Sequence, residues 1–103
     1  APATAMYGYK TVYNGVDYSA VYDYNYYVSH NPDIKRAFGV DDTAVLRHFI
    51  TYGMKEGRQA KNSFNVKNYK NRYADLKRVY GNDLKAYYMH YIVYGKNERR
   101  NAK

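Results

Sequence analysis

The segment PDIKRAFG at residues 32–39 recurs 42 positions later as ADLKRVYG at residues 74–81. The offset holds without a gap on both sides of the segment, where it aligns identical residues: Tyr27 with Tyr69, His48 with His90, Tyr52-Gly53 with Tyr94-Gly95, and Arg58 with Arg100. An ungapped period of this length is typical of a duplicated helical unit. The sequence therefore predicts one compact domain with two tandem units, residues 21–61 and 62–103, after an N-terminal arm at residues 1–20.

Each unit carries the start and stop signals of three short helices. In the first predicted helix an Asp or Asn is the N-cap, and the aromatic residue before it packs on a Tyr inside the helix as a hydrophobic staple. These residues are Tyr22, Asp23 and Tyr27 in one unit and Phe64, Asn65 and Tyr69 in the other. Pro32 begins the second helix and Gly39 ends it, since Pro suits the first helical position and Gly the position after the last.

The third predicted helix of each unit supplies the core. It begins after Asp41 or Asp83 and is expected to stop at Gly53 or Gly95. Its apolar residues recur at spacings of three and four, which places them on one helix face: Val45, Leu46, Phe49, Ile50 and, in the second unit, Tyr87, Tyr88, Tyr91, Ile92. Two charge pairs, Glu56 with Arg58 and Glu98 with Arg100, are interpreted as stabilising a turn and docking one unit on the next. The predicted fold class is all-α, with about three helices in each unit.

The N-terminal arm has a different pattern, TVYNGVDY at residues 11–18. An Asn-Gly pair between two β-prone runs is the strongest short-range signal for a hairpin. A lone hairpin is marginally stable in water, so this one is expected to lie against the helices. An extended, irregular arm is the alternative.

The composition argues against several kinds of site. With no cysteine, the chain forms no disulfide and no thiolate metal site. It also contains no nucleophile elbow, Gly-rich phosphate loop or HExxH motif, so we predict no enzymatic activity, catalytic residue, cofactor or metal. His48 and His90 hold equivalent helix positions, and each is interpreted as making the same structural hydrogen bond in its own unit. A metal site built from both is the alternative.

The net charge of +8 is concentrated in the second unit, where residues 62–103 carry ten basic and three acidic side chains. Clustered cations beside aromatic rings are compatible with nucleic acid. No RNA- or DNA-binding motif accompanies them, so no nucleic-acid partner is predicted, and the charge is interpreted as a solvated face suited to anionic bacterial walls. No apolar run approaches the roughly 20 residues that span a bilayer, so no membrane span is predicted.

Sixteen tyrosines accompany three phenylalanines and no tryptophan, and the repeat sorts them by expected role. An aromatic residue present in both units is interpreted as a packing residue, and Tyr52 with Tyr94 is one such pair. Tyr24 and Tyr26 have no aromatic counterpart and are expected to be exposed, among the Asn and Ser residues typical of binding surfaces. The predicted partner-binding residues are Tyr24, Tyr26, Tyr9, Tyr13, Asn25 and His30. The alternative for the arm tyrosines is that they cover the open end of the two-unit stack.

Two stretches carry a resemblance to a known kind of module: YDYNYYVSHNPDIKRAFGVDDTAVLRHFITYGMKEGRQ at residues 22–59 and FNVKNYKNRYADLKRVYGNDLKAYYMHYIVYGKNER at residues 64–99. They resemble the Tyr-rich tandem helical repeats of secreted and surface proteins of Gram-positive gut bacteria. Such modules accompany cell-wall lytic enzymes and form the binding units of immunoglobulin-binding, superantigen-like proteins. The resemblance implies an extracellular, non-enzymatic binding module. Its expected partner is a host immunoglobulin heavy-chain variable domain, and a cell-wall or host glycan is the alternative.

Overall fold

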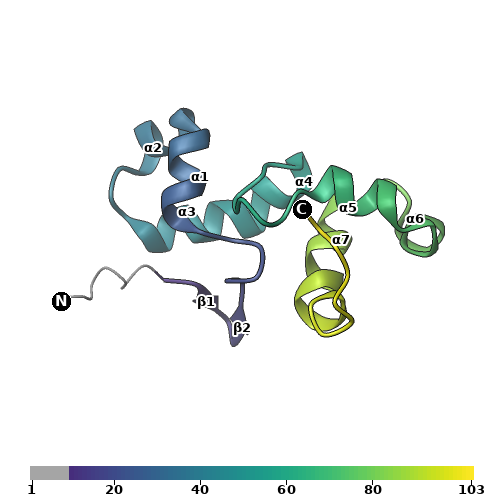
Figure 1. The fold of residues 1–103 in the computed structure, drawn as a ribbon. Helices are drawn as coiled ribbons and strands as arrows, with labels where there is room; N and C mark the ends of the chain where they lie inside the picture. The colour runs from purple at the N-terminus through teal and green to yellow at the C-terminus, as the bar shows by residue number, and fades with distance from the viewer. Residues whose placement is uncertain (1–9) are drawn as a thin grey trace.

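The computed structural model describes residues 10–103, which are mainly helical with a short hairpin at the N-terminal side (Figure 1). We use unit 1 for residues 21–61 and unit 2 for residues 62–103. Unit 1 contains α1 (Tyr24–His30), α2 (Pro32–Phe38), α3 (Asp42–His48), the π-helical segment η3 (Phe49–Gly53) and α4 (Met54–Glu56). Unit 2 contains α5 (Val66–Arg72), α6 (Ala74–Tyr80), α7 (Leu84–His90) and the π-helical segment η4 (Tyr91–Gly95). The mainly helical class and the three principal helices in each unit are confirmed.

The predicted hairpin is also present. Strand β1 (Val12–Tyr13) pairs antiparallel with β2 (Val16–Asp17). Asn14 and Gly15 form the turn with φ angles of 51° and 80°, the left-handed conformation that Asn and Gly adopt in two-residue hairpin turns. One side chain from each strand, Tyr13 and Val16, packs against the helical core, and the hairpin lies alongside α3 (Figure 1).

The N-caps and staples predicted for the first helix of each unit are confirmed. The Asp23 carboxylate accepts hydrogen bonds from two backbone N–H groups of α1, at 3.0 and 3.4 Å. Asn65 caps α5 through one such bond of 3.1 Å. The staple rings on either side of these caps have centroids 5.9 Å apart in unit 1 and 5.5 Å apart in unit 2. Both units therefore enter their first helix in the same way.

A backbone hydrogen bond closes each unit on itself. The Asp23 N–H donates to the Ala60 carbonyl at 2.7 Å, and the Asn65 N–H donates to the Ala102 carbonyl at 2.6 Å. Both alanines are buried. In both units, the segment that follows the third helix thus returns to the start of the first helix.

An arginine ties this returning segment to the second helix of the same unit. Arg58 donates to the two carboxylate oxygens of Asp33 at 3.1 and 2.8 Å and to Glu56 at 2.7 Å. The equivalent contacts in unit 2 join Arg100 to Asp75 and Glu98. The expectation that this charged turn docks one unit on the next is therefore wrong for its side chains, because the carboxylate that faces each guanidinium lies on α2 or α6 of its own unit.

The contact between the units is aromatic instead. The Tyr88 ring of α7 meets Phe49 edge-on, with centroids 5.5 Å apart and an interplanar angle of 83°. The Tyr88 hydroxyl also donates to the backbone carbonyl of Arg58 at 2.5 Å. Leu46, which holds the equivalent position in unit 1, is fully buried as well. One continuous core therefore runs through both units.

The third helix of unit 1 does not stop at Gly53, contrary to the prediction. It continues through η3 into α4 and ends at Gly57, whose φ of 74° is the left-handed conformation of a helix C-cap. Gly53 has another role, because a Cβ at this position would lie 2.6 Å from Tyr27 Oη. At Gly95 a Cβ would meet Tyr69 Oη in the same way. Gly53 and Gly95 therefore recur because the hydroxyl of Tyr27 or Tyr69 approaches the helix backbone closely at each position.

Replacing Gly53 by Ala is expected to destabilise the fold by about 1–3 kcal/mol, because the added methyl group overlaps the Tyr27 hydroxyl. The measurement is urea denaturation of wild type, Gly53→Ala, Tyr27→Phe and the double variant. In the Tyr27→Phe background the Gly53→Ala cost should fall, since the overlapping oxygen is gone. Equal costs in both backgrounds would show that the hydroxyl does not require this glycine.

Candidate binding surface

The structure corrects the expected exposure of Tyr24. Its ring is 7% exposed, and its hydroxyl donates to the Gly39 carbonyl at 3.2 Å. The equivalent residue of unit 2 is Val66, which is also buried. The apolar residue Val66 at the equivalent position indicates that Tyr24 is a core residue. That Val66 is not aromatic did not mean that Tyr24 is exposed.

Three other predicted residues lie together on the outer side of α1. Asn25 and His30 are exposed, and Tyr26 is half-buried. The Tyr26 and His30 rings are stacked, with centroids 3.9 Å apart and an interplanar angle of 17°. His30 Nδ1 also lies 2.9 Å from the Tyr26 carbonyl oxygen, so the helix itself holds this small polar and aromatic patch in place.

The described arm tyrosines pack against the helices. Tyr13 lies on β1, apart from the α1 patch, and is partly buried against the core. Tyr18 is 5% exposed, and its N–H donates to the Thr11 carbonyl at 2.8 Å. Both tyrosines therefore contribute to the packing of the arm on the helices. Tyr9 lies outside the described residues.

Within residues 10–103, the two exposed tyrosines are ones interpreted as packing residues. Tyr52 and Tyr94 are 56% and 57% exposed. Each contacts the histidine one helical turn earlier, with ring centroids 5.5 Å apart for His48 and 5.6 Å apart for His90. The interpretation of this pair as core is therefore wrong, because recurrence in a repeat can preserve a surface feature as well as a core one.

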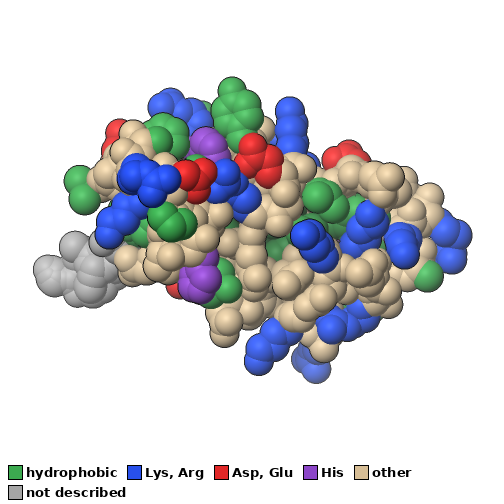
Figure 2. Space-filling view, turned by 90° about the horizontal axis from the view of Figure 1, so that it is seen from above, with side chains coloured by type: hydrophobic (Ala, Val, Ile, Leu, Met, Phe, Trp, Pro, Cys, Tyr) green, Lys and Arg blue, Asp and Glu red, His purple; other side chains and the backbone are tan. Residues whose placement is uncertain are grey.

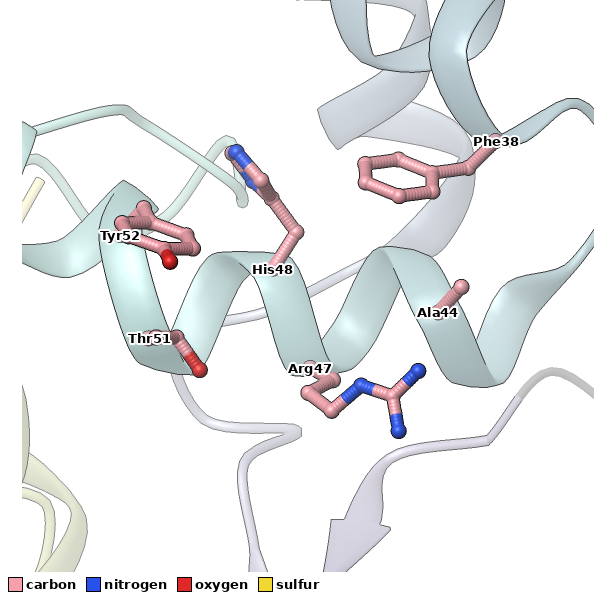
Figure 3. Close-up of a pocket in the computed structure, with 6 residues that line it drawn as sticks. All are labelled: Phe38, Ala44, Arg47, His48, Thr51 and Tyr52. Atoms are coloured by element: carbon pink, nitrogen blue, oxygen red, sulfur yellow. The ribbon is translucent and has the colours of Figure 1, made fainter.

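A groove runs along the outer face of α3 and η3 beside Tyr52, and we call it the unit 1 groove (Figure 3). It encloses about 310 Å³ and is lined by Phe38, Ala44, Arg47, His48, Thr51 and Tyr52. Phe38 comes from the end of α2, and the other residues follow one side of the helix at spacings of three and four. The His48 ring lies between the rings of Phe38 and Tyr52, at 5.5 Å from each.

A buried tyrosine positions the histidine of this groove. Tyr27 Oη lies 3.2 Å from His48 Nδ1, and Tyr69 Oη lies 2.9 Å from His90 Nδ1. The shared structural hydrogen bond predicted for the two histidines is thus confirmed. Burial, with a smaller contribution from the Arg58 guanidinium, lowers the pKa of His48 below its ordinary value of 6.5, so the ring is neutral at pH 7. Because Nδ1 is engaged by Tyr27, Nε2 is the nitrogen left to meet a ligand.

Unit 2 repeats the row of rings without the polar groups. Tyr80, His90 and Tyr94 succeed one another, with centroids 6.1 and 5.6 Å apart. Met89 and Val93 stand where unit 1 has Arg47 and Thr51. The row of rings therefore belongs to the shared scaffold, whereas the guanidinium and hydroxyl donors distinguish the unit 1 groove.

None of the groove residues is among the partner-binding residues predicted from the sequence. Positions 44, 47, 48, 51 and 52 lie on the side of the third helix opposite Val45, Leu46 and Phe49, so the helical period already separated them from the core face. Nothing in the sequence indicates that Phe38 lies beside His48, since that contact depends on how α2 folds back on α3. The groove is lined by aromatic rings and hydrogen-bond donors, and none of its six lining residues is a Ser, a Cys or a carboxylate.

Comparisons with known protein families, with curated proteins and with solved structures find no match to this chain. Within residues 10–103, no group of three or more His, Asp or Glu side chains is arranged to hold a metal ion. No helix in the same range is both long enough and apolar enough to cross a bilayer.

Acidification below neutral pH is expected to destabilise the chain through His48 and His90. Burial lowers the pKa of both rings below 6.5, so the unfolded chain binds protons first as the pH falls. Their contribution is constant above about pH 7, and the free energy of unfolding declines from about pH 6.5 downward. Urea denaturation from about pH 7.5 to 5 should show a shallower decline for His48→Gln/His90→Gln than for wild type. Equal slopes would contradict this origin.

Truncation of the two neighbouring tyrosines should separate core from surface. Tyr24→Ala removes a buried ring and its hydrogen bond to Gly39, and we expect it to cost about 3–5 kcal/mol. Tyr26→Ala removes a half-buried surface ring and should cost about 1 kcal/mol or less. Thermal and urea unfolding measure both, and similar costs would contradict the assignment.

Proposed function

We propose that this chain is a non-enzymatic binding module of a bacterial surface or secreted protein, and that the unit 1 groove receives a side chain of an immunoglobulin heavy-chain variable domain. The observation that carries the proposal is the groove itself, in which the neutral ring of His48 lies between Phe38 and the exposed ring of Tyr52, and the exposed Arg47 lines the same groove. Tyrosine and arginine are the residue types that most often dominate the binding energy of protein interfaces.

The shape of the groove supports a protein partner. A volume of about 310 Å³ lies at the small end of ligand pockets and suits one inserted side chain. The Phe38 and His48 rings give this site apolar walls, and the Arg47 guanidinium and Thr51 hydroxyl supply hydrogen-bond donors at its edge. On α1 of the same unit, exposed Asn25 and His30 with half-buried Tyr26 form a further surface patch, which we propose as peripheral contacts.

The choice of an immunoglobulin variable domain rests on the resemblance of the two repeat stretches to Tyr-rich modules of gut-bacterial surface proteins. That resemblance also underlies the proposed extracellular location. The groove contributes the physical reason why such a module would bind through unit 1, because unit 2 lacks the two polar donors.

A glycan of the cell wall or of the host is the second candidate. Sugars present an apolar ring face that stacks on aromatic side chains, while their hydroxyl groups need hydrogen-bond partners. Phe38 and Tyr52 offer such faces, and the His48 ring lies between them. Arg47 and Thr51 offer polar partners along the same groove.

Binding to a panel of Fab fragments from different variable-gene families tests the proposal. At least one Fab should form a complex on gel filtration, and Tyr52→Ala should weaken it by about 2 kcal/mol, which is roughly 30-fold in Kd. Arg47→Met/Thr51→Val gives the groove the side chains of unit 2 and should also weaken binding. The matched control is Tyr94→Ala, which removes the equally exposed ring of unit 2 and should leave Kd nearly unchanged.

Two results would contradict the proposal. If no Fab binds and the chain is instead retained on peptidoglycan or host glycans in a Tyr52-dependent way, the second candidate function replaces the first. If Tyr52→Ala and Tyr94→Ala weaken Fab binding equally, the unit 1 groove is not the binding site.

A further inference from the structure

A second hollow lies on unit 2, between α5 and the beginning of α7, and we call it the basic cleft. It encloses about 300 Å³ and is lined by Lys67, Lys70, Asn71 and Leu84. The first three residues are spaced by three and four along α5, so they share one helix face. The Lys70 ammonium is oriented by a hydrogen bond of 2.8 Å to Asn82 Oδ1.

Comparison with unit 1, which has the same helices, shows which residues of the basic cleft the fold requires. Its residues equivalent to the lining of the basic cleft are Asn25, Val28, Ser29 and Asp42. The same helices therefore form there without any cation and with one carboxylate. Lys67 and Lys70 are not required to build the unit, so their presence in the cleft calls for another explanation.

The cations of the cleft are also free of internal ion pairs. Unit 2 has ten basic and three acidic side chains, whereas unit 1 has six and five. Two of the three acids of unit 2, Asp75 and Glu98, are bound to Arg100. The third, Asp83, precedes Leu84 but does not line the cleft. Among the described residues neither Lys67 nor Lys70 has a carboxylate partner, so no ion pair neutralises their positive charge; Lys67 is exposed and Lys70 is half-buried.

We propose that the basic cleft binds the phosphate groups of a linear polyol-phosphate polymer of the bacterial cell wall. Lysine is a compact point charge on a flexible stem and suits phosphates that are held on a mobile chain. The Asn71 amide can donate to a phosphate oxygen, and Leu84 supplies an apolar surface for the carbon atoms of the polyol. In Figure 2 further Lys and Arg side chains surround this half of the molecule, at the right, and would attract a polyanion.

The lining of the cleft distinguishes this ligand from a nucleic acid. Proteins that hold single-stranded nucleic acids combine a positive groove with aromatic rings on which the bases stack. The four residues that line the basic cleft include no aromatic ring. The site therefore offers charge complementarity to phosphates without a platform for bases. This binding is separate from the unit 1 groove, so one module could hold a wall polymer through unit 2 and another partner through unit 1.

The test is a calorimetric titration of the purified chain with delipidated poly(glycerol phosphate) in about 0.15 M NaCl. Lys67→Asn/Lys70→Val, which installs the residues of unit 1, should weaken binding at least about tenfold and lower the salt dependence. The control Lys77→Ala/Arg78→Ala removes the same charge from the exposed face of α6 and should weaken binding less than about threefold. Lys67→Arg/Lys70→Arg, which keeps the charge, should bind nearly as wild type does.

Four results would overturn the proposal. The first is no measurable binding of the polymer by the wild-type chain, and the second is an equal loss of binding in the cleft variant and in the α6 control. The third is equally strong binding of oligothymidylate or duplex DNA of matched charge. The fourth is loss of binding in the charge-preserving arginine variant while it remains folded. Circular dichroism melting of every variant checks the fold. Fab binding should be unchanged in Lys67→Asn/Lys70→Val, which keeps this test independent of the function proposed for unit 1.

Discussion

A tyrosine hydroxyl that lies between a histidine and a glycine organises each unit of this protein. Tyr27 reaches from α1 to His48 on α3, and its oxygen occupies the space where a side chain at Gly53 would begin. Because the buried hydroxyl needs a hydrogen-bond partner, the ring cannot turn away without losing it. The contact therefore sets the distance between the first and third helices, and the π-helical segment that contains the glycine follows the same path in both units. The same three residue types recur in unit 2 as Tyr69, His90 and Gly95.

This arrangement also determines which surfaces are available for recognition. The hydrogen bond between Tyr27 and His48 Nδ1 holds the His48 ring between Phe38 and Tyr52, and all three of these last residues line the groove. Because both units have the same fold, the side chains that differ between them are better candidates for binding residues than the side chains that they share. Arg47 and Thr51 make the groove of unit 1 polar, whereas Lys67 and Lys70 give unit 2 a basic cleft. Two units with one fold thus present two chemically different surfaces.

Much of the fold could be predicted because its signals are local. The caps at Asp23 and Asn65, the staples and the Asn-Gly turn each act within a few residues, so a short window of sequence contains their physical cause. The roles of the tyrosines could not be predicted in this way. Tyr24 was expected at the surface and is buried, whereas Tyr52 was expected in the core and is exposed. Comparing the two units identifies positions that recur, but recurrence does not say whether a position faces inward or outward.

The sequence by itself determined the two-unit organisation, the helix starts, the hairpin and the concentration of positive charge in unit 2, because periodicity, capping chemistry and composition are properties of the chain alone. The tertiary structure decided which rings are exposed, that Gly53 accommodates a hydroxyl, and that Arg58 binds Asp33 within its own unit. It also decided that Phe38 joins His48 in a groove and that Lys67 and Leu84 line the same cleft. These features depend on the packing of helices against one another, and the residues that meet there are separated by up to 26 positions along the chain.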